Sequence, residues 1–240
     1  MSEGNKNVVL IMGKPSTGKS TSLMKLKNQN KFAYMNTDLK ELPFKSSFMV
    51  NVEITDAYDV LGFIDQIEQE PEVQGGILDT ITFLMGMFER QYVKGAANTQ
   101  KMWGEYGDFY RTLVHKIKTG TKDYALLAHA STENNEEEMR LDTFVPVKGA
   151  VGKLGVEADF TTILSTKQMP IRELKKWEND LLHITEEEEE DGFKFVFQTR
   201  ITKNTIGEKM RSAMGLWDRK ELYIDNDLQQ VFDRLKQYYN

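Results

Sequence analysis

Residues 13–20, Gly-Lys-Pro-Ser-Thr-Gly-Lys-Ser, fit the phosphate-binding loop pattern G-x-x-x-x-G-K-[ST]. The glycines allow backbone N–H groups to wrap tightly around phosphate oxygens, and Lys19 would reach the β- and γ-phosphates. The Ser20 hydroxyl would be a ligand of Mg²⁺. The pattern therefore predicts that the chain binds a nucleoside triphosphate, ATP, together with magnesium. The predicted nucleotide-binding residues are Gly13, Lys14, Pro15, Ser16, Thr17, Gly18, Lys19, Ser20 and Thr21.

Three polar residues follow apolar segments that read as strands. Asp79 ends Gly76-Ile77-Leu78-Asp79, where its carboxylate would hold the water shell of Mg²⁺. The alternative is that Asp79 caps a helix from residue 80 onward, and both roles are compatible. A metal role is favoured because the phosphate-binding loop lies upstream.

Asp38 and His129 are placed by the same argument, because carboxyl ends of parallel strands face the ligand crevice. Asp38 follows the segment 31–37 and would orient or deprotonate an attacking water, although an isolated aspartate is also a common turn residue. His129 ends the apolar segment 124–130. It is either a sensor of the γ-phosphate or a hydrogen-bonded structural residue.

These residues need a frame of strands alternating with helices. Helical periodicity follows the phosphate-binding loop, with Leu23 and Leu26 on one face, and recurs after Asp56, which is a candidate cap. The alternation indicates a parallel sheet with helices on both faces. The segments with strand character are 8–12, 31–37, 48–54, 75–79 and 124–130, and further helices are predicted over 80–92 and 100–118.

The second half of the chain predicts a different arrangement. Residues 131–157 are polar and rich in glycine, which is typical of a long functional loop. The strand-like segments 160–166, 181–185 and 193–201 suggest an antiparallel addition to the sheet. The acidic run 186–191 is interpreted as a solvated hairpin tip, and Asp225 or Asn226 as the cap of a final helix.

Composition sets outer limits. The chain has 240 residues, with 31 Lys+Arg against 37 Asp+Glu, a net charge of −6 and 40% hydrophobic residues. We expect one domain spanning 1–240, with a core over about 8–166 and an extension over 167–240, rather than a disordered chain. No apolar run approaches the roughly 20 residues of a membrane span, and the first seven residues are polar. The absence of cysteine excludes disulfides, thiol chemistry and Cys-ligated metals, so we expect a cytoplasmic location without membrane contact.

Together, the loop at 13–20 and the polar residues Asp38, Asp79 and His129 resemble the RecA-type ATPase core, over roughly residues 8–166. More narrowly, the chain is similar to phage-encoded RecA-like P-loop ATPases associated with single-strand annealing and recombination. The resemblance implies an ATPase in which Asp38 activates water and His129 senses the γ-phosphate. RecA itself carries Glu and Gln at these two places. If the chain is phage-encoded, its location would be the host bacterial cytoplasm.

The resemblance also implies a homo-oligomer in which a cation from a neighbouring subunit completes each site. The finger candidates are Arg200, Lys203, Lys209 and Arg211. Single-stranded DNA would contact the two loops after the strands of Asp79 and His129, at 92–101 and 131–153, where Tyr92 and Phe144 would stack on bases. Four acids, Glu133 and Glu136 to Glu138, oppose this in the second loop. The DNA-binding candidates are Lys94, Lys101, Arg140, Phe144, Lys148 and Lys153.

Three functions remain open. The first is a recombination-associated ATPase acting on single-stranded DNA, and the second is a small-molecule kinase with the same phosphate-binding loop. A kinase of that kind would close an Arg-rich lid, whereas the long loop has only Arg140 before Lys148. The third is a non-catalytic assembly module whose contacts ATP regulates. Net acidity argues against non-specific binding of polyanions over the whole surface, so any nucleic acid must meet a local basic strip.

Overall fold

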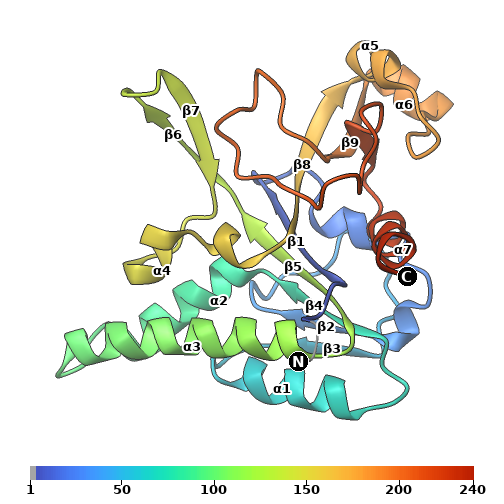
Figure 1. Cartoon of the computed structure of the whole chain (residues 1–240). Coiled ribbons are helices and arrows are strands. Elements are labelled where there is room, and N and C mark those ends of the chain that lie inside the picture. The colour runs from blue at the N-terminus through green and yellow to red at the C-terminus, as the bar shows by residue number, and fades with distance from the viewer. Residues whose placement is uncertain (1–3) are drawn as a thin grey trace.

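The structure, a computed structural model, describes residues 4–240. Eight strands form one sheet in the order β10-β9-β8-β1-β5-β4-β2-β3 (Figure 1). Strands β1 to β5 and β8 pair in parallel. Strand β9 pairs antiparallel with β8, and β10 pairs antiparallel with β9. The predicted α/β fold, a mainly parallel sheet with an antiparallel C-terminal extension, is confirmed. The strands are β1 (Val8–Gly13), β2 (Phe32–Asn36), β3 (Val50–Glu53), β4 (Gly75–Asp79), β5 (Asp123–His129), β8 (Thr162–Pro170), β9 (Phe193–Gln198) and β10 (Tyr223–Asp225).

Helices cover both faces of this sheet. Alternate residues of the fully buried β1 point to opposite faces, so Leu10 and Met12 join one apolar core while Val9 and Ile11 join the other. Helices α1 (Asp59–Gln69), α2 (Ile81–Phe88) and α3 (Thr99–Thr119) pack on the first face, and α7 (Leu228–Tyr239) packs on the second (Figure 1). A π-helical turn, η3 (Glu89–Val93), continues α2. Because β1 to β5 and β8 pair in parallel within the sheet, their carboxyl ends lie along one edge.

The prediction of a long loop over 131–157 was wrong. A hairpin of β6 (Ser131–Asn135) and β7 (Arg140–Phe144) projects away from the sheet, followed by α4 (Gly149–Leu154) and a 3-10 turn, η4 (Val156–Asp159) (Figure 1). The hairpin is held by polar contacts, including hydroxyls of Thr132 and Thr143 that lie 3.1 Å apart. A ribbon of this kind does not bury an apolar face, so its strands lack the hydrophobic alternation that reveals strands in a sequence.

The helix predicted after the phosphate-binding loop is also much shorter than expected. Only one 3-10 turn, η1 (Ser20–Leu23), forms, and a second, η2 (Gln29–Lys31), follows. The Gln29 side chain donates to the carbonyls of Leu23 (3.0 Å) and Met24 (3.2 Å), and Asn28 takes a left-handed conformation with φ 55°. The side-chain amide thus replaces the donors of a continuing helix. Leu23 and Leu26 are nevertheless buried, as predicted.

Near the C-terminus, three expectations need correction. Residues 181–185 form no strand, and β10 takes the sheet position. The segment is tied to β10 at Asp225, whose N–H donates to Leu181 O (2.8 Å) and whose carboxylate accepts from His183 N (3.0 Å). The acidic run is helix α6 (Glu186–Asp191), with a capping box from Thr185. The final helix is capped by Asp227, one residue beyond the predicted candidates. Two short helical turns precede α6: α5 (Ile171–Leu174) and η5 (Lys175–Trp177).

Within residues 4–240, no helix is both long and apolar enough to cross a membrane. The first three residues, part of the polar start noted above, lie outside the described residues.

Candidate active site

The phosphate-binding loop leaves the carboxyl end of β1 at Gly13. Ser16 and Gly18 both have positive φ, 60° and 92°, a conformation that turns the loop back on itself and that glycine adopts without steric cost. The Thr17 hydroxyl donates to Lys14 O at 2.8 Å and closes the loop internally. The backbone of residues 13–18 therefore forms a concave turn.

Two residues distant in sequence hold the glycines of this loop. A Cβ on Gly13 would lie 2.0 Å from Thr166 Oγ1, so only glycine fits beside this residue in the middle of β8. The same Thr166 hydroxyl lies 2.6 Å from the Thr17 hydroxyl. On the other side, Asn226 Nδ2 donates to Gly18 O at 2.7 Å. The loop is thus clamped between β8 and the segment before α7.

Lys19 is buried at the centre of the loop. Its ammonium donates to Gly13 O (3.0 Å) and Lys14 O (2.8 Å), and its side chain is 7% exposed. Burial lowers the pKa of Lys19 to about 8, although the nearby carboxylates of Asp79 and Asp38 oppose the shift. A partly desolvated ammonium among loop carbonyls is a strong attractor for an anionic oxygen.

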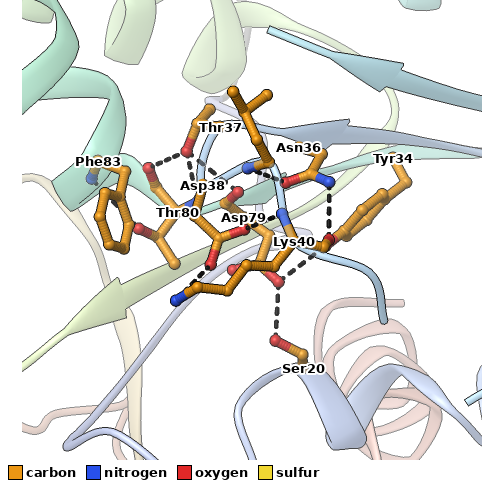
Figure 2. Close-up of polar contacts among 10 residues, drawn as sticks. Ser20, Tyr34, Asn36, Thr37, Asp38, Lys40, Asp79, Thr80 and Phe83 are labelled. Carbon is orange, nitrogen blue, oxygen red and sulfur yellow. Dashed lines mark hydrogen bonds and ion pairs between the residues drawn. The ribbon is translucent and has the colours of Figure 1, made fainter. Parts of the chain in front are cut away.

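Asp79, at the end of β4, meets the loop through Ser20. Ser20 Oγ donates to Asp79 Oδ2 at 2.8 Å, and Tyr34 Oη, from β2, donates to the same oxygen at 2.9 Å (Figure 2). The carboxylate is 4% exposed, and its burial raises the pKa of Asp79 against the lowering effect of these two hydrogen bonds. Strand β5 lies between β1 and β4, so the loop itself spans the gap. The alternative role as a helix cap falls to Thr80, whose hydroxyl accepts from Phe83 N.

Asp38 is brought to the same edge by its neighbour Thr37. Thr37 N donates to Asp79 O at 2.8 Å, and its hydroxyl accepts from Thr80 N at 2.8 Å (Figure 2). These bonds tie the end of β2 to the end of β4. The Asp38 carboxylate accepts from Lys40 N (3.1 Å) and lies 3.6 Å from the Lys40 ammonium. Its charge acts on the pKa of Lys19, Asp79 and His129, so the four groups lie near one another at this edge of the sheet.

His129 lies at the same edge of the sheet, at the end of β5. Its backbone N–H donates to the Thr82 hydroxyl at 2.8 Å, and its ring packs edge-on against Phe83 at 5.1 Å between centroids. Burial, and then the charge of Lys19, lower the pKa of His129, so the ring is neutral at pH 7. The Lys40 ammonium lies 5.7 Å from the centre of the Phe83 ring. A neutral imidazole and a flexible cation therefore flank the carboxylates.

A cavity of about 310 Å³ borders the other side of the loop. Lys14 and Thr17 of the loop face residues of β8 and the hairpin across it. On its wall, Lys167 forms an ion pair with Glu208, whose second oxygen, Oε2, is buried without a hydrogen-bond partner in the described chain. This pair was not singled out in the sequence because its members are 41 residues apart.

Magnesium would be held here by few protein groups. Ser20 and Asp79 converge on one point, while no group of three His, Asp or Glu side chains suited to a metal occurs within residues 4–240. Mg²⁺ commonly keeps several waters and binds one or two protein groups plus substrate phosphates. The hydroxyl–carboxylate pair therefore fits magnesium that arrives with a triphosphate.

Several other predicted residues lie elsewhere, and three of them are paired with acids. Lys148 and Lys94 both pair with Glu89, at 2.8 and 3.7 Å. Arg140 pairs with Asp142 at 2.7 Å. Lys101 lies exposed in the first turn of α3. The structure does not gather these cations with the phosphate-binding loop.

The two aromatic candidates for base stacking differ. Tyr92 packs edge-on with Tyr58 at 5.1 Å and beside Phe88 at 5.0 Å, and its hydroxyl donates to Asp56. It therefore has a structural role in the cluster over α2. Phe144 is half-buried and lines an open cavity of about 610 Å³, together with Lys153 and Lys209.

The finger candidates also separate. Arg211 is held within the chain, because its guanidinium donates to the carbonyls of Phe160 (2.7 Å) and Glu157. Arg200, Lys203 and Lys209 are exposed. Arg200 and Lys203 line a third cavity, described below.

Sequence reasoning missed six residues that shape the site. A tyrosine in an apolar strand and threonines at strand ends carry no motif, and a clamp such as Asn226 acts over a separation of 208 residues. Only Asn226 had drawn attention, as a helix cap. The six are Tyr34, Thr37, Lys40, Phe83, Thr166 and Asn226.

Three comparisons relate the chain to known proteins. The solved structure of the flagellar accessory protein FlaH from Methanocaldococcus jannaschii is similar over 81% of this chain and 78% of FlaH, with 14% identity and a TM-score of 0.37. No curated protein matches the chain. The profile of a family described as AAA domain matches residues 5–171, more than two thirds of the 240. The chain belongs to the AAA domain family.

The matched segment of this AAA domain contains the predicted catalytic residues of this sheet edge. It begins before β1 and ends just after β8. The loop at 13–20, Asp38, Asp79 and His129 all fall inside it. The antiparallel strands β9 and β10, the clamp Asn226 and helix α7 lie beyond the match, so part of the support for the loop comes from outside the AAA domain profile.

Proposed function

We propose that the protein binds ATP with magnesium and hydrolyses it slowly, and that it acts on single-stranded DNA in recombination, single-strand annealing or replication. The observation that carries the catalytic part is the convergence of Lys19, Ser20 and Asp79 with Asp38 at one sheet edge. A clamped, concave loop with a desolvated lysine suits a triphosphate. A carboxylate beside it suits hydrolysis.

Each residue has a distinct task in this proposal. Backbone N–H groups of the loop and the Lys19 ammonium would bind the β- and γ-phosphate oxygens. Asp38 would orient the attacking water and accept its proton. His129, neutral at pH 7, would donate or accept a hydrogen bond at the γ-phosphate rather than repel or attract it by charge.

Ser20 and Asp79 would hold magnesium, Ser20 directly and Asp79 through the hydration shell. When bound, the ion neutralises charge that develops on the phosphate oxygens. Tyr34 would keep its hydrogen bond to Asp79 and so orient the carboxylate.

Measurement of phosphate release by wild type and Lys19→Ala tests the catalytic part. The variant should lose most ATP affinity or turnover, because it removes the charge that meets the phosphates. Lys45→Ala is the matched control, since this exposed lysine lies outside the phosphate-binding loop and has no role in the proposal. Equal turnover in all three proteins would refute ATP hydrolysis at this loop.

The nucleic-acid partner and the assembly belong to the same proposal. Single-stranded DNA should stimulate phosphate release, and copies of the chain should assemble so that an exposed cation of one copy completes the site of the next. Mixing Lys19→Ala with Lys209→Ala should then restore some turnover if Lys209 is the finger. Turnover that needs a small acceptor instead of DNA would favour the kinase, and binding without turnover the assembly module.

A further inference from the structure

A cavity of about 760 Å³ opens between the short helices after β8 and the segment after β9. The helices α5 and α6 stand at the far end of β8 and β9 (Figure 1). Four cations line this cavity, Lys176, Arg200, Lys203 and Arg219, against a single acid, Glu173. In a chain with a net charge of −6, this is a local reversal of sign.

Three of these cations are unengaged. Glu173 neutralises Lys176, with 2.7 Å between ammonium and carboxylate. The charged ends of Arg200, Lys203 and Arg219 have no hydrogen-bond or ion-pair partner in the chain between residues 4 and 240. They contrast with Lys94, Arg140 and Lys148, which acids neutralise. Unpaired arginines around a hollow are suited to phosphate, which they bind in a bidentate manner.

The cavity also has an aromatic wall. Trp177 is half-buried and meets Tyr223 edge-on, with 6.4 Å between ring centroids. Met169, Ile201 and Leu222 add aliphatic side chains to the lining. A flat apolar surface beside unpaired cations matches a nucleobase joined to its phosphate, since bases stack on aromatic side chains while Lys and Arg pair with the backbone. The volume lies within the usual range for ligand pockets.

We propose that this cavity binds a nucleotidyl group, the base against Trp177 and the phosphate between Arg200, Lys203 and Arg219. The expected source is single-stranded DNA; a free nucleotide has the same chemistry. The inference rests on the proposed function only for the identity of that partner. It moves the DNA site away from the loops at 92–101 and 131–153.

The cavity shares a wall with the pocket beside the phosphate-binding loop. Asn204 lines both cavities. The segment that carries it is closed by Thr205, whose hydroxyl accepts from Thr202 N (2.9 Å) and Gln198 Nε2 (2.9 Å). A ligand on Arg200 and Lys203 therefore contacts the same short turn that borders Lys14 and Thr17. A ligand in one cavity would therefore shift the lining of the other cavity through this turn.

The binding test uses fluorescence anisotropy of a labelled thymidine 20-mer with the full chain. We expect Arg200→Gln/Lys203→Gln to weaken binding about ten-fold or more and to lower the salt slope by about 0.7 for each cation removed. Lys25→Gln/Lys45→Gln is the matched control, because it removes two exposed lysines that line none of the three cavities. Lys148→Gln/Lys153→Gln tests the rival loop. Equal affinity of the cavity variant and wild type, or a loss confined to the loop variant, would overturn the proposal.

A second readout reports stacking directly. Oligonucleotide should quench tryptophan fluorescence in wild type, and Trp177→Phe should remove that quenching while Trp103 and Trp217 still emit. Persistence of full quenching in Trp177→Phe would exclude base contact in this cavity. Far-ultraviolet circular dichroism and melting temperature check that each variant is folded.

Competition separates the sources of the ligand. If unlabelled oligonucleotide displaces the labelled 20-mer at a lower concentration than thymidine monophosphate does, the ligand is a DNA strand. If thymidine monophosphate displaces it at the lower concentration, the ligand is a free nucleotide. Both results support the site. Displacement by inorganic phosphate or polyglutamate as effective as by either would show a simple anion site and overturn the base contact.

Two outcomes keep this inference apart from ATP hydrolysis. Lys19→Ala should retain oligonucleotide binding even where it abolishes turnover. If Lys19→Ala instead loses oligonucleotide binding while Arg200→Gln/Lys203→Gln binds like wild type, the strand lies at the phosphate-binding loop and the proposal is refuted. The second outcome combines two results: mixing Lys19→Ala with Arg200→Gln/Lys203→Gln restores turnover, and Arg200→Gln/Lys203→Gln alone binds the oligonucleotide like wild type. This combination would assign Arg200 and Lys203 to the phosphates bound by a neighbouring copy and would refute the nucleotidyl site in this cavity.

Discussion

Tyr34 Oη lies 2.9 Å from Asp79 Oδ2 and donates a hydrogen bond to the oxygen that also accepts from Ser20. The tyrosine is buried in β2 and stacks on Phe48, with 5.2 Å between centroids. Because the ring is fixed by packing and the hydroxyl by the carboxylate, Tyr34 determines which way the Asp79 carboxylate faces.

Tyr34→Phe should raise the magnesium concentration needed for half-maximal turnover by about ten-fold, since partners of metal ligands commonly contribute that much to metal affinity. The ring still packs, so the fold should persist. Tyr124→Phe is the control, because it removes a similar bond from a buried tyrosine to a carboxylate, Glu68, at 2.8 Å. An identical magnesium titration for both variants would contradict the role of Tyr34.

ATP affinity should fall as the pH rises above about 8. In the free protein, burial holds the pKa of Lys19 at about 8, and a bound triphosphate would raise it. Below pH 8 the lysine is charged in both states, whereas above it binding requires uptake of a proton. Affinity should therefore decline about ten-fold per pH unit, measured by calorimetry in buffers of different ionisation enthalpy. Proton release on binding above pH 8 would contradict this.

Asp38→Asn should lower kcat by about 10²–10⁴-fold and change KM little, because a general base acts mainly in the transition state. Steady-state phosphate release measures both constants. Glu41→Gln is the control, since it neutralises an exposed acid three residues away. A parallel loss of ATP affinity in Asp38→Asn would assign the residue a structural role.

Asn226→Ala should weaken ATP binding several-fold and cost about 1 kcal/mol of unfolding free energy, through loss of the bond to Gly18 O. Titration with a fluorescent ATP analogue and urea unfolding measure the two effects. Gln229→Ala removes a comparable bond, to Lys27 N at 2.9 Å, without touching the phosphate-binding loop. Equal ATP affinity in both variants would show that the clamp is dispensable.

Gly13→Ala should destabilise the fold by about 1–3 kcal/mol, because the new methyl group overlaps the Thr166 hydroxyl. Gly13→Ala/Thr166→Ala should recover part of that loss, and thermal unfolding of the two single variants and the double variant completes the cycle. Strict additivity would mean that the contact between β1 and β8 is not the cause.

The parts of the fold that the sequence predicted are those with hydrophobic periodicity. The buried strands β1, β4 and β5 stood out because both of their faces are apolar. The hairpin β6–β7 and the helix α6 were missed, because polar ribbons and exposed helices of acidic residues have no buried face to produce a pattern. Capping by Thr185 and Glu188 was visible in the sequence and would have identified α6.

The site divides in the same way. The loop at 13–20 has fixed spacing, and Asp79 ends an apolar strand, so both were predicted, and the structure places them 2.8 Å apart through Ser20. The clamps Thr166 and Asn226 were not predictable, because they approach the loop only when β8 and α7 are packed. Of the unpaired cations that line the 760 Å³ cavity, Arg200 and Lys203 were candidates in the sequence and Arg219 was not, and only the folded chain shows that all three lack an acid.

The carbonyl of Gly13 accepts from the Lys19 ammonium and also from the backbone N–H of Ala130, each at 3.0 Å. The second bond uses no side chain, so position 130 can change its residue and keep the contact, whereas position 13 has no room for even one methyl group. Among diverging copies of this gene, we therefore expect position 13 to stay glycine while position 130 drifts among small residues. A comparison based on residue identity would therefore detect the constraint on position 13 but not the backbone hydrogen bond from position 130.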